Sequence, residues 1–485
     1  MALKRKKGHF LVSKTQKTKL TSSKPDWLLA TRQLFNQVVG FYVLIYNTYP
    51  DFADVPSHKV YSVIEPLTIP NKQRPDVQFP LPYDCPQLFR RAAIKKALGI
   101  FLSWRKNYQK WQQKSEKLKE KRTLKGRKVK LPKPPVLPRQ YNCSPTYYKG
   151  MYKEEPGDSL VLKLWTGSSW AWVKHRYFAY ALDPLWVKGS PTIVIGQRGI
   201  TLNWVYEKHV PSLGKIVEQI NKNGGLRLCS VDLNLDGDIA VCSILESDGT
   251  GVRELATRFV KGYSRHQHRR KRLLGKDAVA KSLTNANQTI DGMNARLWRK
   301  LKNRERYEGE RVSRRIADFA HQYGATVIVF EHLTNLKPNQ AKYSRRSNQK
   351  RAYWLKSKIY LRTKDKALND YGILTVRVSP KNTSRLWAYD GSPVLRGNQV
   401  SDTGFVFTEK GMGALVLSEK GEICNSDLNS ARNIGLRYFS KYFEKPTLVT
   451  ERFDRVAMNY CGSVVPTLSK GCGVPRSGGV ATPVI

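Results

Sequence analysis

Two apolar segments, each carrying an acidic residue near its end, limit most strongly what this chain can fold into. Residues 226–234 form a mainly apolar run that carries Asp232, and residues 325–331 form an apolar run that ends in Glu331. Runs of this kind predict buried strands, and the second is typical of a parallel strand covered on both faces. Two further strand-like segments follow the first run, so three sequential antiparallel strands are expected there, the second and third over residues 239–244 and 252–260.

A third acidic residue, Asp427, opens a predicted helix that continues to about Phe439. The other segments of this half predict helical regions and a fifth strand, over residues 278–323, 350–371 and 373–378. The three acids thus lie on the first strand, the fourth strand and a late helix. In an RNase H-like fold, acids in these positions converge at one edge of the sheet. We therefore predict an α/β, RNase H-like domain whose site contains Asp232, Glu331 and Asp427.

Each acid also has a purely structural interpretation when it is considered alone. Asp232 could cap a turn, Glu331 could pair with a nearby arginine, and Asp427 could be a helix N-cap. Considered together, three buried carboxylates would repel one another and stay partly protonated without a cation. Two Mg²⁺ ions about 3.5–4 Å apart would remove that repulsion and clamp the attacking and leaving oxygens of a phosphodiester cleavage. The three residues are therefore predicted to be both catalytic and metal-binding.

The charge balance indicates the class of partner. Lysine and arginine number 85 against 38 aspartates and glutamates, which gives a net charge of +47. Because 40% of the residues are hydrophobic and 11% aromatic, the chain can still bury a large core and is not a disordered basic tail. A folded chain this basic repels itself unless a polyanion neutralises it, so nucleic acid is the expected partner. A small-molecule enzyme of the usual neutral or acidic kind is disfavoured.

Three tracts concentrate the positive charge. Residues 105–139 hold fourteen lysines or arginines against two glutamates, and residues 265–272 and 342–351 are also strongly basic. A solvated helix face followed by a linker is the plainer alternative, but such faces usually mix both signs. We predict instead that these tracts contact phosphates. The residues predicted to do so are Lys117, Lys119, Lys121, Arg122, Arg127, Lys128, Arg269, Arg270, Lys271, Arg272, Arg345, Arg346, Lys350 and Arg351.

The N-terminal half predicts helices followed by short strands. Apolar residues at helical spacing indicate a helix over about 27–47, then residues 50–85 look irregular, and a second helix begins near Pro86. Alternating segments indicate antiparallel strands of a small barrel or sheet, followed by a helix, over residues 160–164, 170–174, 192–195 and 210–223. Core packing is the main expectation, and base stacking the alternative, for the aromatic residues in this region: Trp165, Trp170, Trp172 and Tyr177.

Cysteine usage and hydropathy indicate the compartment. The seven cysteines include no Cys-x-x-Cys motif, as expected of reduced thiols in a cytosolic protein. The longest apolar run, residues 38–46, has 9 residues, whereas a membrane-spanning helix needs about 20. The charged start of the chain is not followed by the apolar region of a signal peptide. We expect a cytoplasmic protein with no membrane partner.

Three segments around the acidic residues resemble the RuvC motifs of the TnpB proteins and their descendants, the compact type V CRISPR effectors. They are residues 230–234, 329–333 and 426–434. Residues 351–384 are similar to the family stretch between the second and third motifs, and over 10–210 the family has a recognition lobe inserted in a wedge-like barrel. The resemblance implies an RNA-guided DNA endonuclease with Asp232, Glu331 and Asp427 as metal ligands, in a prokaryotic, nucleoid-associated protein. It implies no role for His332, where the family more often has a polar or acidic residue.

One departure from the family pattern concerns zinc. The family carries a zinc ribbon with two Cys-x-x-Cys pairs before the third motif. This chain has Trp387 and Asp390 at the first pair, and Phe407 and Lys410 at the second. A structural zinc needs four ligands, so no zinc is expected. Apolar packing of strands is expected to keep the ribbon shape instead, over residues 404–408 and 414–417.

These expectations combine into a chain of two lobes. The predicted divisions are a wedge-like β-barrel (1–23 and 140–210), a helical recognition insert (24–139), a linker helix (211–225), the nuclease domain (226–382 and 426–444), a zinc-ribbon-like insert without its cysteines (383–425) and a flexible tail (445–485). The expected partners are a guide RNA and double- and single-stranded target DNA, with the protein a monomer or homodimer on the RNA.

Two other functions stay open at this point. An RNA-guided DNA-binding protein with weak or absent cleavage is the first, and the presence of all three acids favours cleavage over it. A DDE transposase is the second, since it is also built on an RNase H fold. That enzyme expects the acid order Asp, Asp, Glu, whereas this chain gives Asp, Glu, Asp.

Overall fold

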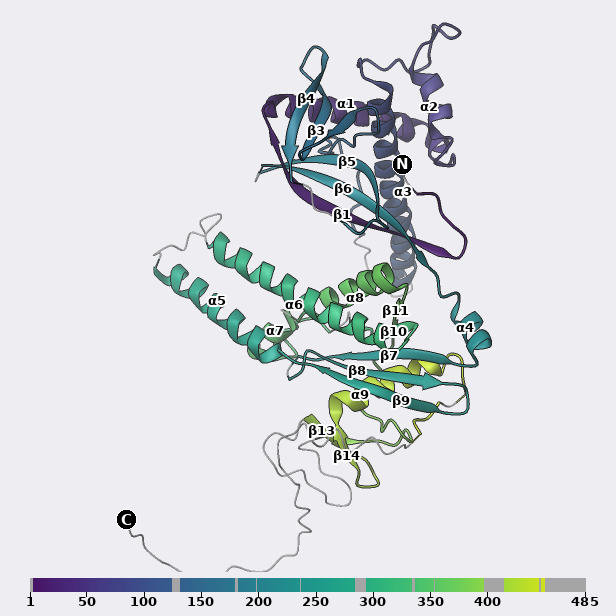
Figure 1. Ribbon diagram of the computed structural model, residues 1–485, viewed down its shortest axis with the longest axis vertical. Helices are drawn as coiled ribbons and strands as arrows, with labels where there is room; N and C mark the ends of the chain where they lie inside the picture. The colour runs from purple at the N-terminus through teal and green to yellow at the C-terminus, as the bar shows by residue number, and fades with distance from the viewer. Residues whose placement is uncertain are drawn as a thin grey trace, which may run out of the picture. The chain divides into compact units, whose positions relative to one another are not determined.

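The computed structural model describes residues 3–123, 131–178, 182–197, 199–235, 237–283, 294–333, 336–352, 354–396, 414–444 and 446–449. The chain divides into two compact units, Met1–His209 and Val210–Ile485 (Figure 1).

The first unit is built on a six-stranded sheet with the order β2-β3-β4-β1-β6-β5. The strands are β1 (His9–Ser22), β2 (Tyr152–Glu155), β3 (Ser159–Trp165), β4 (Trp170–Tyr177), β5 (Val187–Gly196) and β6 (Gly199–Pro211). The pairs β2–β3, β3–β4, β1–β4 and β5–β6 are antiparallel. The sheet curls (Figure 1), but β2 and β5 are its edges in the described part of the chain, so the predicted small barrel is a half-closed sheet.

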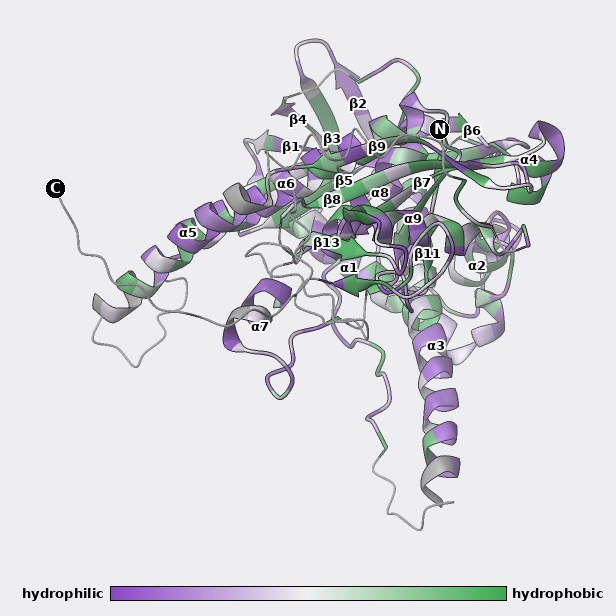
Figure 2. Cartoon of the chain, turned by 90° about the horizontal axis from the view of Figure 1, so that it is seen from below, coloured by the Kyte–Doolittle hydropathy of each residue, from purple (hydrophilic) through white to green (hydrophobic). Residues whose placement is uncertain are grey.

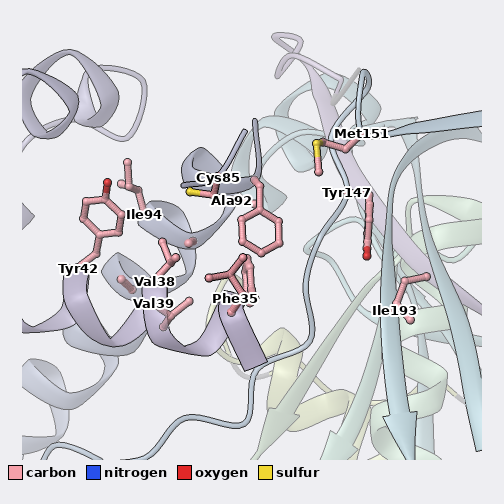
Figure 3. Packing of buried hydrophobic residues seen from close by; sticks show 14 of the residues in the cluster. Phe35, Val38, Val39, Tyr42, Cys85, Ala92, Ile94, Tyr147, Met151 and Ile193 are labelled. Atoms are coloured by element: carbon pink, nitrogen blue, oxygen red, sulfur yellow. The ribbon is translucent and has the colours of Figure 1, made fainter. Parts of the chain in front are cut away.

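Helices pack on this sheet through a large apolar core. They are α1 (Pro25–Thr48), the short 3-10 helix η1 (Pro50–Ala53), α2 (Val60–Thr68) and α3 (Gln87–Thr123). Phe35, Val38 and Tyr42 recur at helical spacing on α1, and all three are at most 1% exposed. Figure 3 shows them in one cluster with Ala92 of α3 and Ile193 of β5. The apolar stripe of α1 is therefore the feature that joins α3 to the sheet.

The segment over residues 50–85 contains more regular structure than its sequence predicts. Both η1 and α2 lie in it, and α2 accommodates Pro66 two residues before its end. Glu65 of α2 pairs with Arg90 and Arg91 of α3 at 3.1 and 2.8 Å. These ion pairs fix α2 on α3, a long-range interaction that a local sequence pattern does not contain.

Helix α1 is also the described segment that is long and apolar enough, by length and composition alone, to cross a membrane. Half of its most apolar window is buried inside the unit. A buried core helix meets the same criterion, and α1 packs against α3 and β3.

Helix α3 changes character along its length. Its first half packs in the core, and its second half is mostly hydrophilic (Figure 2). Four aromatic rings form a ladder along it, with centroids 5.3–5.6 Å apart: Phe101, Trp104, Tyr108 and Trp111. The indole nitrogens of Trp104 and Trp111 donate to the carbonyls of Pro135 and Pro132 at 3.1 and 2.8 Å. The proline-rich segment therefore runs back along the helix and is tied to its basic half.

The second unit is built on a five-stranded sheet with the order β11-β10-β7-β8-β9. The strands are β7 (Leu226–Leu233), β8 (Ala240–Ser247), β9 (Val252–Val260), β10 (Val327–Glu331) and β11 (Leu374–Val378). The pairs β7–β8 and β8–β9 are antiparallel, whereas β10 runs parallel to both β7 and β11. The predicted parallel strand over residues 325–331 is confirmed.

Helices cover both faces of this sheet. They are α4 (Ile216–Asn223), α5 (Tyr263–Leu283), α6 (Ala295–Gln322), α7 (Arg345–Ala352), α8 (Lys356–Tyr371) and α9 (Ser426–Phe439). On one face, Val231 of β7 packs in a core with Ile316 of α6 and Ile359 of α8. On the other face, Leu228 of β7 packs with Ile434 of α9. Alternate residues of each strand therefore face α9 or the α6–α8 pair.

Two predicted helical regions have different bounds in the structure. The helix predicted over 210–223 is wrong in its first part, because β6 continues to Pro211 and α4 begins only at Ile216. Helical sequence predicted from residue 278 begins earlier, at Tyr263, so the basic tract 265–272 lies inside α5 rather than before it. The local sequence around Pro211 and in the basic tract indicates only weakly where a strand ends or a helix begins. These bounds depend on contacts with other elements: β6 with the first sheet and α5 with α6.

A small three-stranded sheet, β12-β13-β14, precedes α9. Its strands are β12 (Leu395–Arg396), β13 (Leu415–Leu417) and β14 (Ile423–Asn425), paired antiparallel. Trp387, Val394 and Val416 form its small apolar core. The strand predicted over 414–417 is present, whereas that over 404–408, with Phe407 and Lys410, lies outside the described residues, as does nearly all of the predicted tail.

Candidate active site

A cavity of about 850 Å³ opens in the second unit, and all three predicted carboxylates line it: Asp232, Glu331 and Asp427. These residues come from β7, β10 and α9, and almost 200 residues separate the first from the last. The cavity therefore brings together the three acids that the sequence singled out.

Strand alternation explains how two of the acids reach the same place. Leu228 and Val329 both face α9, and Asp232 and Glu331 lie an even number of residues beyond them on the same strands. The register pairs Phe330 with Val231, so the two acids lie at adjacent ends of parallel strands. Both carboxylates therefore lie on the face that α9 covers.

Asp427 is held at the start of α9 by its own cap. The side chain of Asn425 accepts hydrogen bonds from the backbone nitrogens of Asp427 and Leu428 at 2.9 and 3.1 Å. The N-cap is thus Asn425, which leaves the carboxylate of Asp427 in the first turn, where the positive end of the helix dipole favours a negative charge.

The cavity perturbs the acidity of all three carboxyl groups. Burial first, and then the charges of Glu331 and Asp427, raise the pKa of Asp232 well above its usual range. Burial also raises the pKa of Glu331, against a hydrogen bond from Thr383, and raises that of Asp427 to about 6, against the charge of Arg396. A carboxyl that is buried near others of the same charge holds its proton more tightly. Shifts of this kind cluster at functional sites.

The donor chemistry of this cavity suits a hard divalent cation. Three carboxylates supply only oxygen ligands, which is what Mg²⁺ prefers, and a cation would relieve their mutual repulsion. As the side chains stand, no three histidine, cysteine, aspartate or glutamate residues of the described ranges are close enough together to hold an ion. The residue types fit a metal, while the coordination geometry itself is not formed.

Three further residues shape the site and were not singled out from the sequence. Thr383 donates its hydroxyl hydrogen bond to Glu331 and is only 3% exposed. Arg377 and Arg396 line the cavity, and the charge of Arg396 lowers the pKa of both Asp232 and Asp427. Arg396 comes from β12 of the small sheet, so no spacing within the three motifs could have indicated it.

The predicted phosphate-contacting residues lie elsewhere, on three helices, and none of those described lines this cavity. On α3, Lys117 and Lys119 are exposed, and the same helix carries Lys121 and Arg122. Arg127 and Lys128 lie outside the described residues. The exposed part of the first tract therefore belongs to the first unit.

Helix α5 divides its basic tract between two faces. Arg269, Lys271 and Arg272 are exposed, whereas Arg270 is only 3% exposed and donates to Gln267 at 2.9 Å. One turn earlier, His266 is also buried, and burial lowers its pKa, against the charges of the buried Glu308 and Glu305 of α6, which raise it. Helical periodicity turns Arg270 inward toward α6, so it is not among the surface residues of the tract.

Helix α7 carries the third tract. Arg345 is exposed, Lys350 and Arg351 are half-buried, and Arg346 belongs to the same helix. The guanidinium of Arg351 stacks over the ring of Tyr343 at 3.9 Å. This stacking occupies one face of the Arg351 side chain.

Comparison with known proteins identifies relatives. The profile of the Aq_aa04 family matches residues 13–166. The chain is 27% identical over 217 residues to the TnpB-like protein aq_aa05 of Aquifex aeolicus (strain VF5), which covers 44% of this chain and 67% of that protein. This match confirms the resemblance to TnpB that the three motifs predict.

Solved structures of Cas12 proteins also align with this chain. CasPhi-2 (Cas12j) bound to crRNA and phosphorothioate-DNA aligns with a TM-score of 0.46 and 10% identity, over 87% of this chain and 91% of that chain. The Cas12f1–sgRNA–target DNA complex aligns with a TM-score of 0.31 and 14% identity, over 87% of this chain and 98% of that chain.

Proposed function

We propose that this chain, with its similarity to the TnpB proteins, is an RNA-guided DNA endonuclease acting in the prokaryotic cytoplasm. Its second unit would be an RNase H-like, RuvC-type nuclease domain that hydrolyses phosphodiester bonds with two Mg²⁺ ions. Asp232, Glu331 and Asp427 would hold the ions. A guide RNA and its target DNA would be the partners.

The observation that carries the proposal is the meeting of three carboxylates from β7, β10 and α9 in one cavity. Burying several carboxylates together is costly unless a cation or a proton compensates them. The raised pKa values of all three indicate that this cost is present. The meeting of such groups from distant parts of the chain supports a functional site in this cavity.

The other residues support binding and orientation. Asp232, Glu331 and Asp427 would hold Mg²⁺, which would supply stabilisation of the charge on the scissile phosphate and a more acidic attacking water. Arg377 and Arg396 line the cavity and would attract the DNA backbone toward the carboxylates. The exposed basic residues of α3, α5 and α7 would grip phosphates of the guide or its duplex without reading sequence.

The proposal is tested with the protein purified together with its bound RNA. Asp232→Ala, Glu331→Ala and Asp427→Ala should each abolish Mg²⁺-dependent cleavage and leave RNA and DNA binding nearly intact, because the site serves chemistry and the basic surfaces serve affinity. Asp365→Ala, which removes an exposed carboxylate of α8, is the control and should cleave like the parent. A carboxylate variant that cuts at the parent rate would remove that residue from the site.

The alternative function, RNA-guided DNA binding with weak or absent cleavage, predicts a different result. The parent would then bind guide and target tightly but would not cut DNA at any Mg²⁺ concentration. Sequencing the RNA that co-purifies with the protein supplies the guide for both measurements.

A further inference from the structure

Two asparagines of α9 hold a loop segment by its backbone. Asn429 donates to the carbonyl of Leu386 at 2.8 Å and accepts from the backbone nitrogen of Ala388 at 3.0 Å. Asn433 donates to the carbonyls of Leu386 and Thr383 at 2.7 and 2.9 Å. The two asparagines are four residues apart, so they lie on one face of the helix. We call Asn429 and Asn433 the asparagine clamp and residues 383–388 the clamped segment.

The chemistry of the asparagine clamp is specific to the amide group. Asn433 donates to two carbonyls with a single nitrogen, which no carboxylate could do, and Asn429 uses its donor and its acceptor at once. Asn429 is fully buried. An apolar side chain of similar size would fill the space but leave these backbone groups without the partners that burial requires.

The clamped segment begins with the residue that touches Glu331. Thr383 donates its hydroxyl to the Glu331 carboxylate and also lies 3.1 Å from the carbonyl of Pro380. Asn382, just before it, has a φ of +63°, a left-handed conformation that asparagine adopts more readily than most residues. The turn at Asn382 therefore directs the Thr383 hydroxyl toward Glu331. The asparagine clamp holds the backbone carbonyl of Thr383 through Asn433.

We propose that the asparagine clamp and Thr383 are positioning residues that set Glu331 relative to Asp427. Asp427 lies two residues before Asn429 on α9, so the helix that carries one carboxylate also holds the segment that orients the other. A displacement of α9 would move both together and preserve their spacing. The inference rests on the proposed nuclease function, because it assigns a role within that site.

The test compares variants of the full chain with its bound RNA. Thr383→Val removes the hydroxyl at nearly constant shape, Thr383→Ser restores it, and Asn433→Leu removes half of the clamp. Loss of a partner that orients a metal-binding side chain typically costs about 10- to 100-fold in metal affinity or activity. We expect a loss of that size in single-turnover cleavage and in Mn²⁺ affinity for Thr383→Val, unchanged nucleic-acid affinity, and recovery in Thr383→Ser.

The control is Thr326→Val. Thr326 directly precedes β10, at the end of the strand opposite Glu331, and its hydroxyl donates to the carbonyl of Arg227 of β7. It should cleave and bind Mn²⁺ like the parent. Amide hydrogen exchange adds a readout that needs no activity: Asn433→Leu should speed exchange in residues 383–388, and Thr326→Val should not.

Several outcomes would overturn the inference while the nuclease proposal stands. They are parent-like cleavage and Mn²⁺ affinity in Thr383→Val, a Thr383→Ser variant as impaired as Thr383→Val, or unchanged exchange in Asn433→Leu. If the parent binds Mn²⁺ but does not cut DNA, the proposed function fails, and the Mn²⁺ affinities and exchange rates still decide the positioning role. A parent that neither cuts nor binds Mn²⁺ would overturn both proposals.

Discussion

Asp427 should make the stability of the metal-free protein depend on pH. Its pKa is raised from 3.8 to about 6, mainly by burial. The folded chain therefore holds this proton more tightly than the unfolded chain. The protonated Asp427 carboxyl therefore contributes to the free energy of unfolding. This contribution is fully present below pH 3.8 and is lost as the pH rises through about 6.

Asp427→Asn should therefore stabilise the metal-free protein at pH 8 by no more than about 3 kcal/mol, since each pKa unit corresponds to about 1.4 kcal/mol. The gain should disappear near pH 4, where the parent carboxyl is itself neutral. Denaturant unfolding at both pH values measures it. Asp365→Asn, on the exposed surface of α8, is the control and should show no such pH-dependent gain.

With added Mg²⁺, the parent should become more stable than Asp427→Asn, the reverse of their order without metal. A ligand that binds only the folded state stabilises it, and the parent has the full set of carboxylates while Asp427→Asn has not. An equal rise of the melting temperature with Mg²⁺ in both proteins would contradict the assignment of Asp427 as a ligand.

At the scale of elements, the contact between α9 and the sheet depends on one glycine. A β-carbon added at Gly435 would lie 2.4 Å from the Cδ1 atom of Leu245, and 3.2 Å from atoms of Leu228 and Ser230. We expect Gly435→Ala to destabilise the protein by about 1–3 kcal/mol, because overpacking forces side chains or backbone to shift. Because α9 carries Asp427, cleavage should also slow.

The matched control is Gly99→Ala on α3. A β-carbon there meets nothing within 4 Å, so the substitution should stabilise the helix by up to about 1 kcal/mol. Denaturant unfolding of both variants gives the comparison. Equal effects would mean that α9 does not pack closely on β7 and β8 at Gly435.

The small sheet before α9 should fold without zinc. Trp387, at one of the positions where the family resemblance would place a cysteine, is 2% exposed and packs with Val394 and Val416. Asp390, at another, bonds to Ser392 and pairs with Lys420 at 3.2 Å. Purified protein should hold no stoichiometric zinc, and a zinc chelator should not unfold it. Elemental analysis finding about one zinc per chain would contradict this and direct attention to Cys424, Asp390 and the histidines.

The elements that the sequence predicts well are those whose pattern is local. The apolar run of β10 predicts a buried strand, and the acid that closes the run predicts that Glu331 lies at the end of that strand. Helix α2 was missed because Pro66 argues against a helix, whereas the ion pairs of Glu65 that hold it involve α3. Arg270 is likewise buried because of the side of α5 on which it lies. A run of basic residues does not show which of them face the neighbouring helix.

The candidate site was predictable only in part for a similar reason. Each acid lies in a motif that is visible along the chain. Thr383 and Arg396 act across the fold, and their roles depend on where the loop before α9 lies. Asn429 and Asn433 appear in the third motif, but nothing in the motif says which backbone groups they hold.

At the scale of the whole molecule, the net charge of +47 should dominate affinity. Replacing Lys117, Lys119, Lys121 and Arg122 with glutamine should flatten the log–log salt dependence of RNA binding by up to about three units, since each phosphate contact contributes about 0.7–0.9. Unrelated RNAs should weaken about as much as the guide. Titrations at several salt concentrations measure the slope, and an unchanged slope would leave these residues as a solvated face.

The order of the six-stranded sheet has a consequence for synthesis of the chain. Strand β1 is made first but lies between β4 and β6, and its Leu20 pairs with Tyr177. At roughly 5–20 residues per second, a ribosome needs on the order of ten seconds or more to reach the end of β6. During that time β1 has two unpaired edges, which are a template for aggregation. Recovery of folded protein should therefore depend on how the nascent chain is sheltered, and removal of β1 should separate β2-β3-β4 from β6-β5.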